Sequence, residues 1–248
     1  MSPSIFTTAW HDEPEPVAES TFTVGAGPAW SAWNAWSPEV EICRFLAELV
    51  TVLRPRHIVE TGTGQGFVTR RVAARLRDGQ RLTCYESGAD WRAALRSLDF
   101  FDGERRVLAS GATPDEEVLS SAEVCLFDSD FSYRLPELQR WSACARPGAV
   151  VFVHDAGNVH VDEPEFALTR AVVEELAIPG VFLDNPRGGF VGHKPTGPGA
   201  RQDPAGSIAN RLVRVEAELH ALRSTKTFRY TARARDLYGR LVRSRRRG

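Results

Sequence analysis

The segment His57-Ile58-Val59-Glu60-Thr61-Gly62-Thr63-Gly64-Gln65-Gly66 carries the strongest structural signal in the chain. Its apolar first half predicts a β-strand, and its three glycines stand at alternate positions, where they let the backbone turn tightly and approach a ligand closely. A helix is expected directly afterwards, because apolar residues recur at helical spacing at Phe67, Val68, Val72 and Leu76. A strand that passes through a glycine loop into a helix indicates a cofactor-binding turn.

The spacing of the glycines separates two classes of cofactor. A dinucleotide-binding loop follows the pattern Gly-x-Gly-x-x-Gly, whereas this chain has Glu60-x-Gly62-x-Gly64-x-Gly66. The second pattern resembles the first motif of class I S-adenosylmethionine-dependent methyltransferases. The resemblance implies that Glu60, Thr61 and the three glycines contact S-adenosylmethionine, and the spacing disfavours a nicotinamide-dependent oxidoreductase.

Residues 81–86, Arg81-Leu82-Thr83-Cys84-Tyr85-Glu86, predict a second strand that ends in a carboxylate. This carboxylate follows the glycines by roughly 20 residues, the distance at which an acidic side chain can accept hydrogen bonds from both ribose hydroxyls. We therefore predict that Glu86 binds the ribose. The alternative is a solvated glutamate at the end of a strand.

Chain length and composition restrict the class of protein. The 248 residues suffice for one α/β domain with appendages. No apolar run is long enough to span a bilayer, and the acidic N-terminal sequence lacks the features of a signal peptide, so a cytoplasmic location is expected. The cysteines form no Cys-x-x-Cys pair and are expected to be reduced core residues, at Cys43, Cys84, Cys125 and Cys144.

Charge is distributed unevenly along the chain. Residues 199–248 carry a formal charge of +9 and residues 1–198 carry −10, although the whole chain carries only −1. A basic, partly apolar tail suits an anionic surface such as a membrane or an acidic partner, and the alternative is a solvated tail or one folded against the acidic body. Nucleic acid is disfavoured as a partner because the acidic body would repel phosphates.

Apolar strands alternate with amphipathic helices, which predicts an α/β fold with a Rossmann-like, mostly parallel sheet covered by helices on both faces. Beyond the two strands above, five more are expected, at 105–110, 123–128, 149–154, 181–183 and 189–194. Helices are expected at 38–53, 65–77, 90–98, 136–145 and 165–177. The last strand must run antiparallel, because the connection 184–189 is too short for a helical crossover.

The methyltransferase resemblance implies the strand order 3-2-1-4-5-7-6 over roughly residues 38–195. We therefore divide the chain into a Trp-rich leader at 1–37, a cofactor-binding domain at 38–198 and a basic helical tail at 199–248. In the leader, Trp10, Trp30, Trp33 and Trp36 either anchor the segment to the domain or form a lid over the substrate pocket. In the tail, apolar residues over 208–222 recur at coiled-coil spacing, which fits either a homodimer or docking onto the domain.

The carboxyl ends of parallel strands meet at one edge of a sheet, so the groups that follow the strands should share one site. Residues 128–133, Asp128-Ser129-Asp130-Phe131-Ser132-Tyr133, and the later His154-Asp155 resemble the subgroup near the cephalosporin-hydroxylase-like and macrocin-type sugar O-methyltransferases. Those proteins carry Asp-Gly-Asp-His-Ser-Tyr, so Ser129 replaces a glycine and Phe131 replaces a histidine. The resemblance also implies that Gly111 and Ala112 flank the adenine and that Asp128 contacts the cofactor.

An alcohol acceptor needs help to become a nucleophile at neutral pH, either from a general base or from a divalent cation. His154 is the first candidate for the base, with Asp155 fixing its tautomer, and His160 is the second. The alternatives are a structural histidine bonded to the backbone at position 154 and a surface histidine at position 160. Alternatively, Asp128 and Asp155 hold a cation, for which carboxylates favour Mg²⁺ and the adjacent histidine favours Mn²⁺.

These features together predict an S-adenosylmethionine-dependent methyltransferase. The expected acceptor is a hydroxyl of a sugar or glycosylated small metabolite, in natural product or polysaccharide biosynthesis. One alternative is N- or carboxyl-methylation of a small metabolite. The other is a non-catalytic binding or scaffold module that keeps the nucleoside pocket.

Overall fold

A computed structural model describes residues 30, 32, 33, 37–157 and 164–196. All of them belong to the first of the two units into which the chain divides, 1–202 and 203–248. The predictions made for Trp10, Trp36, His160, the 208–222 segment and the basic tail fall outside the described residues.

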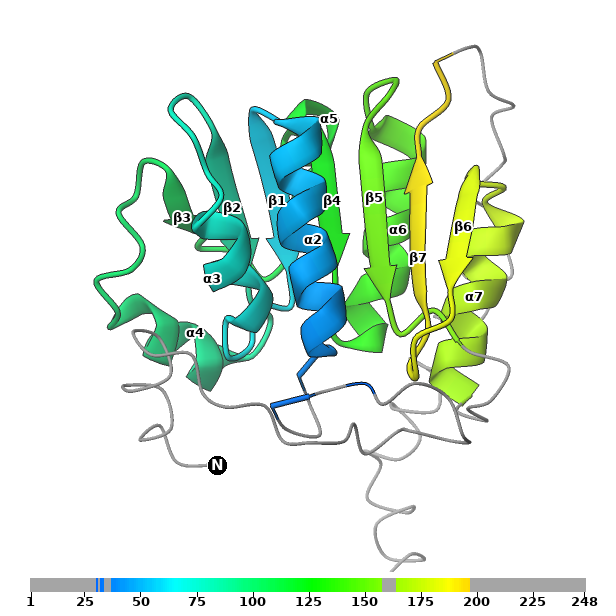
Figure 1. Ribbon diagram of the computed structural model, residues 1–248, viewed down its shortest axis with the longest axis horizontal. Coiled ribbons are helices and arrows are strands. Elements are labelled where there is room, and N and C mark those ends of the chain that lie inside the picture. The colour runs from blue at the N-terminus through cyan, green and yellow to red at the C-terminus, as the bar shows by residue number, and fades with distance from the viewer. Residues whose placement is uncertain (1–29, 31, 34–36, 158–163, 197–248) are drawn as a thin grey trace, which may run out of the picture. The chain divides into compact units, whose positions relative to one another are not determined.

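Seven strands form one sheet in the order β3-β2-β1-β4-β5-β7-β6, as predicted (Figure 1). Neighbouring strands from β1 to β5 pair in parallel, whereas β7 runs antiparallel to both β5 and β6. The strands are β1 (His57–Thr61), β2 (Arg81–Tyr85), β3 (Arg106–Leu108), β4 (Val124–Phe127), β5 (Val150–His154), β6 (Gly180–Leu183) and β7 (Gly189–His193). Each lies within about two residues of its predicted position, which confirms the α/β class and the antiparallel last strand.

Helices cover both faces of the sheet. Helices α2 and α3 pack side by side in front of it in Figure 1, and α6 packs between α5 and α7 on the other face. Their bounds are α2 (Val40–Leu53), α3 (Phe67–Ala73), α4 (Ala89–Arg96), α5 (Glu116–Ser121), α6 (Phe131–Cys144) and α7 (Pro164–Glu175). Among the described helices, none combines the length and the apolarity that crossing a membrane requires.

Three helices differ from the prediction. Helix α3 ends at Ala73, four residues before the predicted end. Helix α5 was not expected, because its six residues are too few to show a clear apolar periodicity. Helix α6 was expected to begin at Pro136, yet it begins at Phe131 and contains Pro136 in its interior. The start is set by Asp130, whose carboxylate accepts a hydrogen bond from the Ser132 N–H and so caps the helix.

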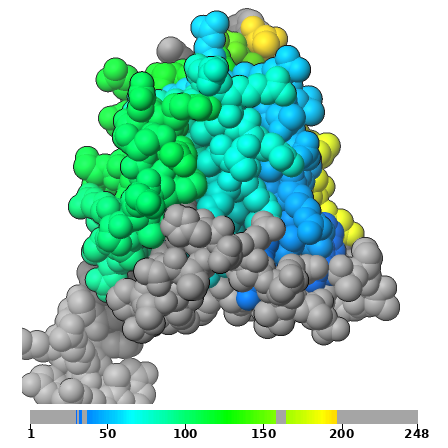
Figure 2. All heavy atoms as spheres, turned by 60° about the vertical axis from the view of Figure 1, so that its left-hand side comes forward, coloured from blue at the N-terminus to red at the C-terminus, as the bar shows by residue number. Residues whose placement is uncertain are grey.

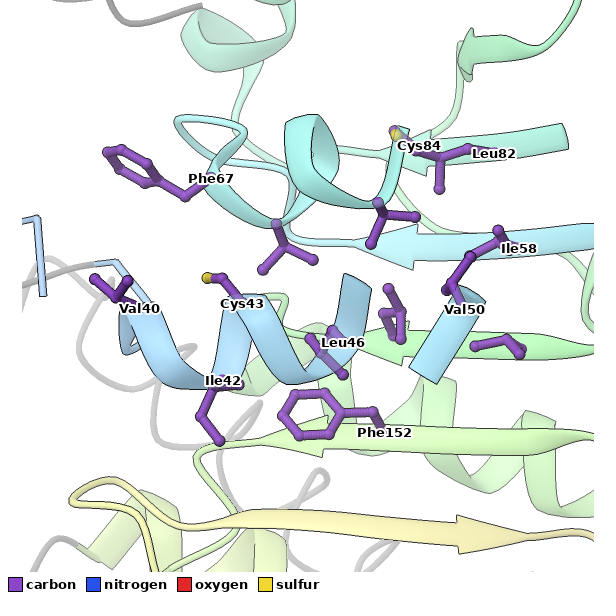
Figure 3. Packing of buried hydrophobic residues seen from close by; sticks show 14 of the residues in the cluster. Val40, Ile42, Cys43, Leu46, Val50, Ile58, Phe67, Leu82, Cys84 and Phe152 are labelled. Carbon is purple, nitrogen blue, oxygen red and sulfur yellow. The ribbon is translucent and has the colours of Figure 1, made fainter. Parts of the chain in front are cut away.

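The core lies between α2 and the sheet. Leu46 and Val50 of α2 meet Ile58 of β1 and Phe152 of β5, each of them no more than 2% exposed (Figure 3). The central strands are apolar on both faces because helices cover both, as expected for parallel strands. Cys84 in β2 and Cys125 in β4 are buried and free, as predicted for core cysteines.

Part of the N-terminal leader packs onto this layer. The Trp33 ring stacks on Phe67 with centroids 4.5 Å apart, and the guanidinium of Arg71 lies over the indole. Figure 2 views the side on which α3 (cyan) lies directly beside α2 (blue). Trp33 is 7% exposed and belongs to the core cluster, so the contact fits the predicted anchoring role. Because Phe67 also lines the cavity described next, this anchor supports a wall of the candidate site.

Candidate active site

A cavity of about 730 Å³ opens at the carboxyl ends of the parallel strands. Of the predicted site residues, the following line it: Glu60, Gly62, Gly64, Glu86, Asp128 and Asp155. The fold thus brings the loops after β1, β2, β4 and β5 to one place, as the sheet topology requires. The lining also contains side chains that sequence reasoning did not select, namely Trp91, Phe131, Arg134, Glu165, Phe166 and Arg187.

The three glycines after β1 all adopt left-handed backbone conformations, with φ of 77° at Gly62, 49° at Gly64 and 73° at Gly66. Their surroundings differ. A Cβ on Gly62 would lie 2.1 Å from the backbone oxygen of Asp128, whereas a Cβ on Gly64 would meet no atom closer than 3.8 Å. Gly62 is therefore required by the close approach of the β1 and β4 loops, and Gly66 serves as the N-cap of α3.

Glu86 fastens the glycine loop from the neighbouring strand. Its Oε2 accepts a hydrogen bond from the Gly64 N–H at 2.7 Å, and its Oε1 accepts one from the Gly88 N–H at 2.8 Å. The side chain is 6% exposed and lines the cavity. Each carboxylate oxygen has a second lone pair, so Glu86 can accept further hydrogen bonds from a ligand while it holds both loops.

Glu60 lies at the end of β1 and is 3% exposed, yet it lines the cavity. Burial raises its pKa to about 7, although a hydrogen bond from the Cys84 thiol at 3.3 Å opposes this effect. A carboxyl group with such a pKa is close to half-protonated at neutral pH. A cation bound in the cavity would therefore favour its ionised form.

His154 is fully buried, and both of its ring nitrogens face carboxylates. Nε2 lies 2.9 Å from Glu39 Oε2, and Nδ1 lies 2.9 Å from Asp128 Oδ1 and 3.2 Å from Asp155 Oδ1. Burial alone would lower the pKa of the imidazole, but the charges of Asp128 and Asp155 and the hydrogen bonds raise it to about 10. His154 is therefore an imidazolium that donates from both nitrogens, which does not fit the predicted role of general base.

Asp155 occupies the centre of this charged cluster. It adopts a left-handed conformation with φ of 55°. Its carboxylate oxygens lie 2.7 Å from Arg187 Nε, 2.9 Å from Arg187 Nη2 and 3.1 Å from Arg134 Nη2. Burial would raise its pKa, but the neighbouring charges of His154, Arg187 and Arg134 lower it to about 2. Asp155 is consequently a fixed anion held by three cations.

Glu39 joins the start of α2 to the far edge of the site. It is 1% exposed, and besides His154 it accepts hydrogen bonds from Asn185 Nδ2 and the Arg187 N–H, both at 3.2 Å. Burial would raise the pKa of Glu39, but the hydrogen bond and charge of His154 lower it. Residues more than a hundred positions apart in sequence are thus joined by a buried ionic network.

The predicted cation site can be tested against these neighbours. Ligand atoms of Asp128, His154 and Asp155 all lie within 4.8 Å of one another, which is close enough for one ion. However, Asp155 is bound by two guanidinium groups, and the Nδ1 of His154 carries a proton that it donates. A divalent cation would have to displace all three positive charges, so the arranged donor set does not fit a resident Mg²⁺ or Mn²⁺.

Three other predicted residues, Thr61, Gly111 and Ala112, are not part of the cavity lining. Thr61 is fully buried, and its hydroxyl donates to Glu137 Oε2 at 2.9 Å. Gly111 and Ala112 follow β3, and neither is among the described residues that line the cavity. Their predicted contact with adenine therefore gains no support from the shape of this cavity.

No model of a known protein family matches the chain, and no curated protein matches it either. Among solved structures, an O-methyltransferase from Bacillus cereus in complex with S-adenosylhomocysteine is similar at a TM-score of 0.50 and 19% identity, over 65% of this chain and 84% of that chain. A protein from Klebsiella pneumoniae provisionally named an O-methyltransferase is similar at 0.51 and 18%, over 65% and 83%. The chain has the methyltransferase fold. At these identities the likeness concerns the fold, and the chemistry must be argued from the site.

Three charged residues of the buried ionic network in this methyltransferase fold were not predicted from the sequence: Glu39, Arg134 and Arg187. Each lies in a segment without a motif, and each acquires its role from partners distant in sequence. Arg187 reaches Asp155 because the β6–β7 turn is pressed against the loop after β5, so closely that a Cβ on Gly188 would lie 2.2 Å from the Gly157 oxygen. The only sequence signal was the short, glycine-rich turn itself.

Proposed function

We propose that this protein is an S-adenosylmethionine-dependent methyltransferase that methylates a hydroxyl of a small molecule, with a sugar or glycosylated metabolite as the preferred acceptor. The observation that carries the proposal is Glu86. Its carboxylate holds the glycine loop and the loop after β2 by two backbone hydrogen bonds while it lines a cavity at the carboxyl ends of the strands. The similar methyltransferase folds support the same reading.

The half of the cavity next to β1 and β2, which Glu60 and Glu86 line, suits two parts of S-adenosylmethionine. Glu86 offers its remaining lone pairs to the two ribose hydroxyls. Glu60 offers a buried carboxylate to a cationic group, such as the amino group of the methionine moiety, and ionises fully when such a cation is bound. When bound, S-adenosylmethionine supplies a methyl group on a positively charged sulfur.

The half of the cavity next to β4 and β5 suits a polyhydroxyl acceptor. The described lining residues of the whole cavity include six carboxylates and two arginines, an excess of negative charge that disfavours anionic acceptors. Phe131 and Phe166 offer apolar faces to a sugar ring, and Asp130 and Glu165 offer exposed oxygens to its hydroxyls.

Asp128 is the group that we propose to accept the hydroxyl proton in place of His154. Its side chain is 21% exposed and lines the cavity, whereas His154 is fully buried behind it. The hydrogen bond from His154 Nδ1 to Asp128 Oδ1 fixes the orientation of this carboxylate. His154 then acts as a positioning residue, and alignment of the acceptor supplies the rest of the rate enhancement.

The proposal is tested by calorimetric titration with S-adenosylhomocysteine, with NADH as a control ligand. We expect micromolar binding that is lost in Glu86→Ala, and no binding of NADH. Transfer of a radiolabelled methyl group to a panel of sugars and glycosylated metabolites then tests the acceptor class. Binding without transfer to any hydroxyl or amine would favour the scaffold alternative, and absence of binding would refute the proposal.

A further inference from the structure

A further buried glutamate, Glu137, lies next to the loops after β1 and β4. Glu137 of α6 is fully buried, and its Oε2 accepts hydrogen bonds from Thr61 Oγ1 at 2.9 Å and from Ser129 Oγ at 2.7 Å. None of the described residues donates a hydrogen bond to its other oxygen, Oε1. Glu137 does not line the cavity, so no step proposed above uses it.

Its two partners stand where the cofactor loop and the β4 loop meet. Thr61 directly precedes Gly62, and Ser129 directly follows Asp128. The backbones already touch here, because the Asp128 N–H donates to the Thr61 oxygen at 3.0 Å and a Cβ on Gly62 would collide with the Asp128 oxygen. A single oxygen of Glu137 therefore receives one hydroxyl from each of the two loops.

Ser129 extends this junction toward the acceptor half of the cavity. Its backbone oxygen accepts a hydrogen bond from Arg134 Nη2 at 2.5 Å, and the same nitrogen donates to Asp155 Oδ2. A displacement of Ser129 would therefore affect both the junction with the glycine loop and the acceptor half of the cavity. Glu137 is the acceptor that fixes its hydroxyl.

A buried carboxyl group is an unfavourable hydrogen-bond acceptor for two hydroxyls, because burial raises the free energy of its charged form. The penalty is visible in the pKa of Glu137, which burial raises to about 7 despite the hydrogen bonds from Ser129 and Thr61. Three apolar side chains of similar size would leave no polar group unpaired here. Stability alone therefore does not explain the group.

We propose that Glu137 is a positioning residue for cofactor binding, which holds the glycine loop and the β4 loop at the separation that the cofactor requires. This inference rests on the proposed function, because it assumes that S-adenosylmethionine occupies the cavity. It adds a role for the pair formed by Glu137 and Ser129, at a position where the resembling sugar O-methyltransferases carry glycine in place of the serine.

The test compares S-adenosylhomocysteine affinity with stability in a set of variants. Glu137→Met removes the acceptor, Thr61→Val and Ser129→Ala each remove one donor, and the triple variant removes all three groups together. Glu137→Gln keeps an oxygen that can accept both hydroxyls. Thr51→Val is the matched control, because within the described part of the chain the Thr51 hydroxyl donates inside α2, to the Ala47 oxygen at 2.9 Å.

We expect Glu137→Met to raise the Kd for S-adenosylhomocysteine by about tenfold or more, since a small misplacement of loops that grip a ligand is costly. The triple variant should regain stability against urea, because no buried polar group is left unpaired, yet its Kd should stay raised. Glu137→Gln should bind within about threefold of the unsubstituted protein, and Thr51→Val should bind as that protein does.

Recovery of affinity together with stability in the triple variant would overturn the inference, since the glutamate would then be structural only. Wild-type affinity in Glu137→Met would overturn it as well. If Glu137→Met fails to fold, Thr61→Val and Ser129→Ala test the same contacts singly, with unchanged Kd in both as the refuting result. A protein that does not bind S-adenosylhomocysteine in any form would instead refute the proposed function.

Discussion

Substitution of His154 by glutamine tests whether this side chain is a structural cation or a catalytic base. His154 is enclosed by Glu39, Asp128 and Asp155 at 2.9–3.2 Å, and it is fully buried. His154→Gln would leave these carboxylates with one positive charge fewer. Removing one partner from a buried ionic network typically costs about 3–5 kcal/mol.

The pKa gives an independent magnitude and a sign. A folded-state pKa of about 10 against an ordinary value of 6.5 corresponds to about 5 kcal/mol of favourable interaction with the imidazolium. Because the folded pKa is raised, this contribution is complete below pH 6.5, where both folded and unfolded chains hold the proton. It declines as the pH rises and is lost above pH 10, with about 2 kcal/mol left at pH 8.5.

Urea denaturation of both proteins between pH 6 and pH 10 measures this difference directly. We expect His154→Gln to be less stable by several kcal/mol at pH 6 and by much less at pH 10, with an exposed histidine, His193, substituted in the same way as the control. The double variant Glu39→Gln/His154→Gln should lose less than the sum of the single losses, because the two residues are in contact. A His154→Gln protein of unchanged stability at every pH, but with turnover abolished, would refute the structural role and restore His154 as the base.

Four further outcomes follow from the site. Glu86→Ala should weaken S-adenosylhomocysteine binding by about tenfold or more in calorimetry, since two charge-assisted hydrogen bonds are lost; an unchanged Kd would remove Glu86 from the ribose site. Gly62→Ala should lower the thermal stability by more than the about 1–2 kcal/mol that a left-handed alanine costs, because its Cβ would also collide with the Asp128 oxygen. Gly79→Ala is the control: Gly79 has a φ of 79° and no atom within 4 Å of its Cβ position, so this variant should lose only that amount. Affinity for S-adenosylhomocysteine should fall as the pH drops below the Glu60 pKa of about 7, by up to about tenfold per pH unit. In Glu60→Gln that pH dependence should be flat, and a slope retained there would assign it to another group. Methyl transfer should be insensitive to EDTA and to added Mg²⁺ or Mn²⁺; a rate that collapses with the chelator would restore Asp128 and Asp155 as metal ligands.

Local sequence was enough to predict the layers of the fold and the glycine loop after β1. The glycine spacing after residue 60, the carboxylate at Glu86 and the alternation of strands with helices are each readable within a window of about 20 residues, because backbone conformation and periodicity are local properties. The short connection at 184–189 predicted an antiparallel last strand for the same reason, since it limits how far the chain can travel.

The chemistry of the part of the site next to β4 and β5 was decided by the tertiary structure. Nothing in the local sequence shows whether His154 faces a cavity or three carboxylates. It becomes a buried cation because Asp128, Asp155 and Glu39 all lie beside its ring in the folded chain. Arg187 and Glu137 likewise acquire their partners across the fold, from Asp155 and from Thr61 and Ser129. Protonation states and charge pairing depend on burial and on distances between residues remote in sequence, and neither quantity is present in the local pattern.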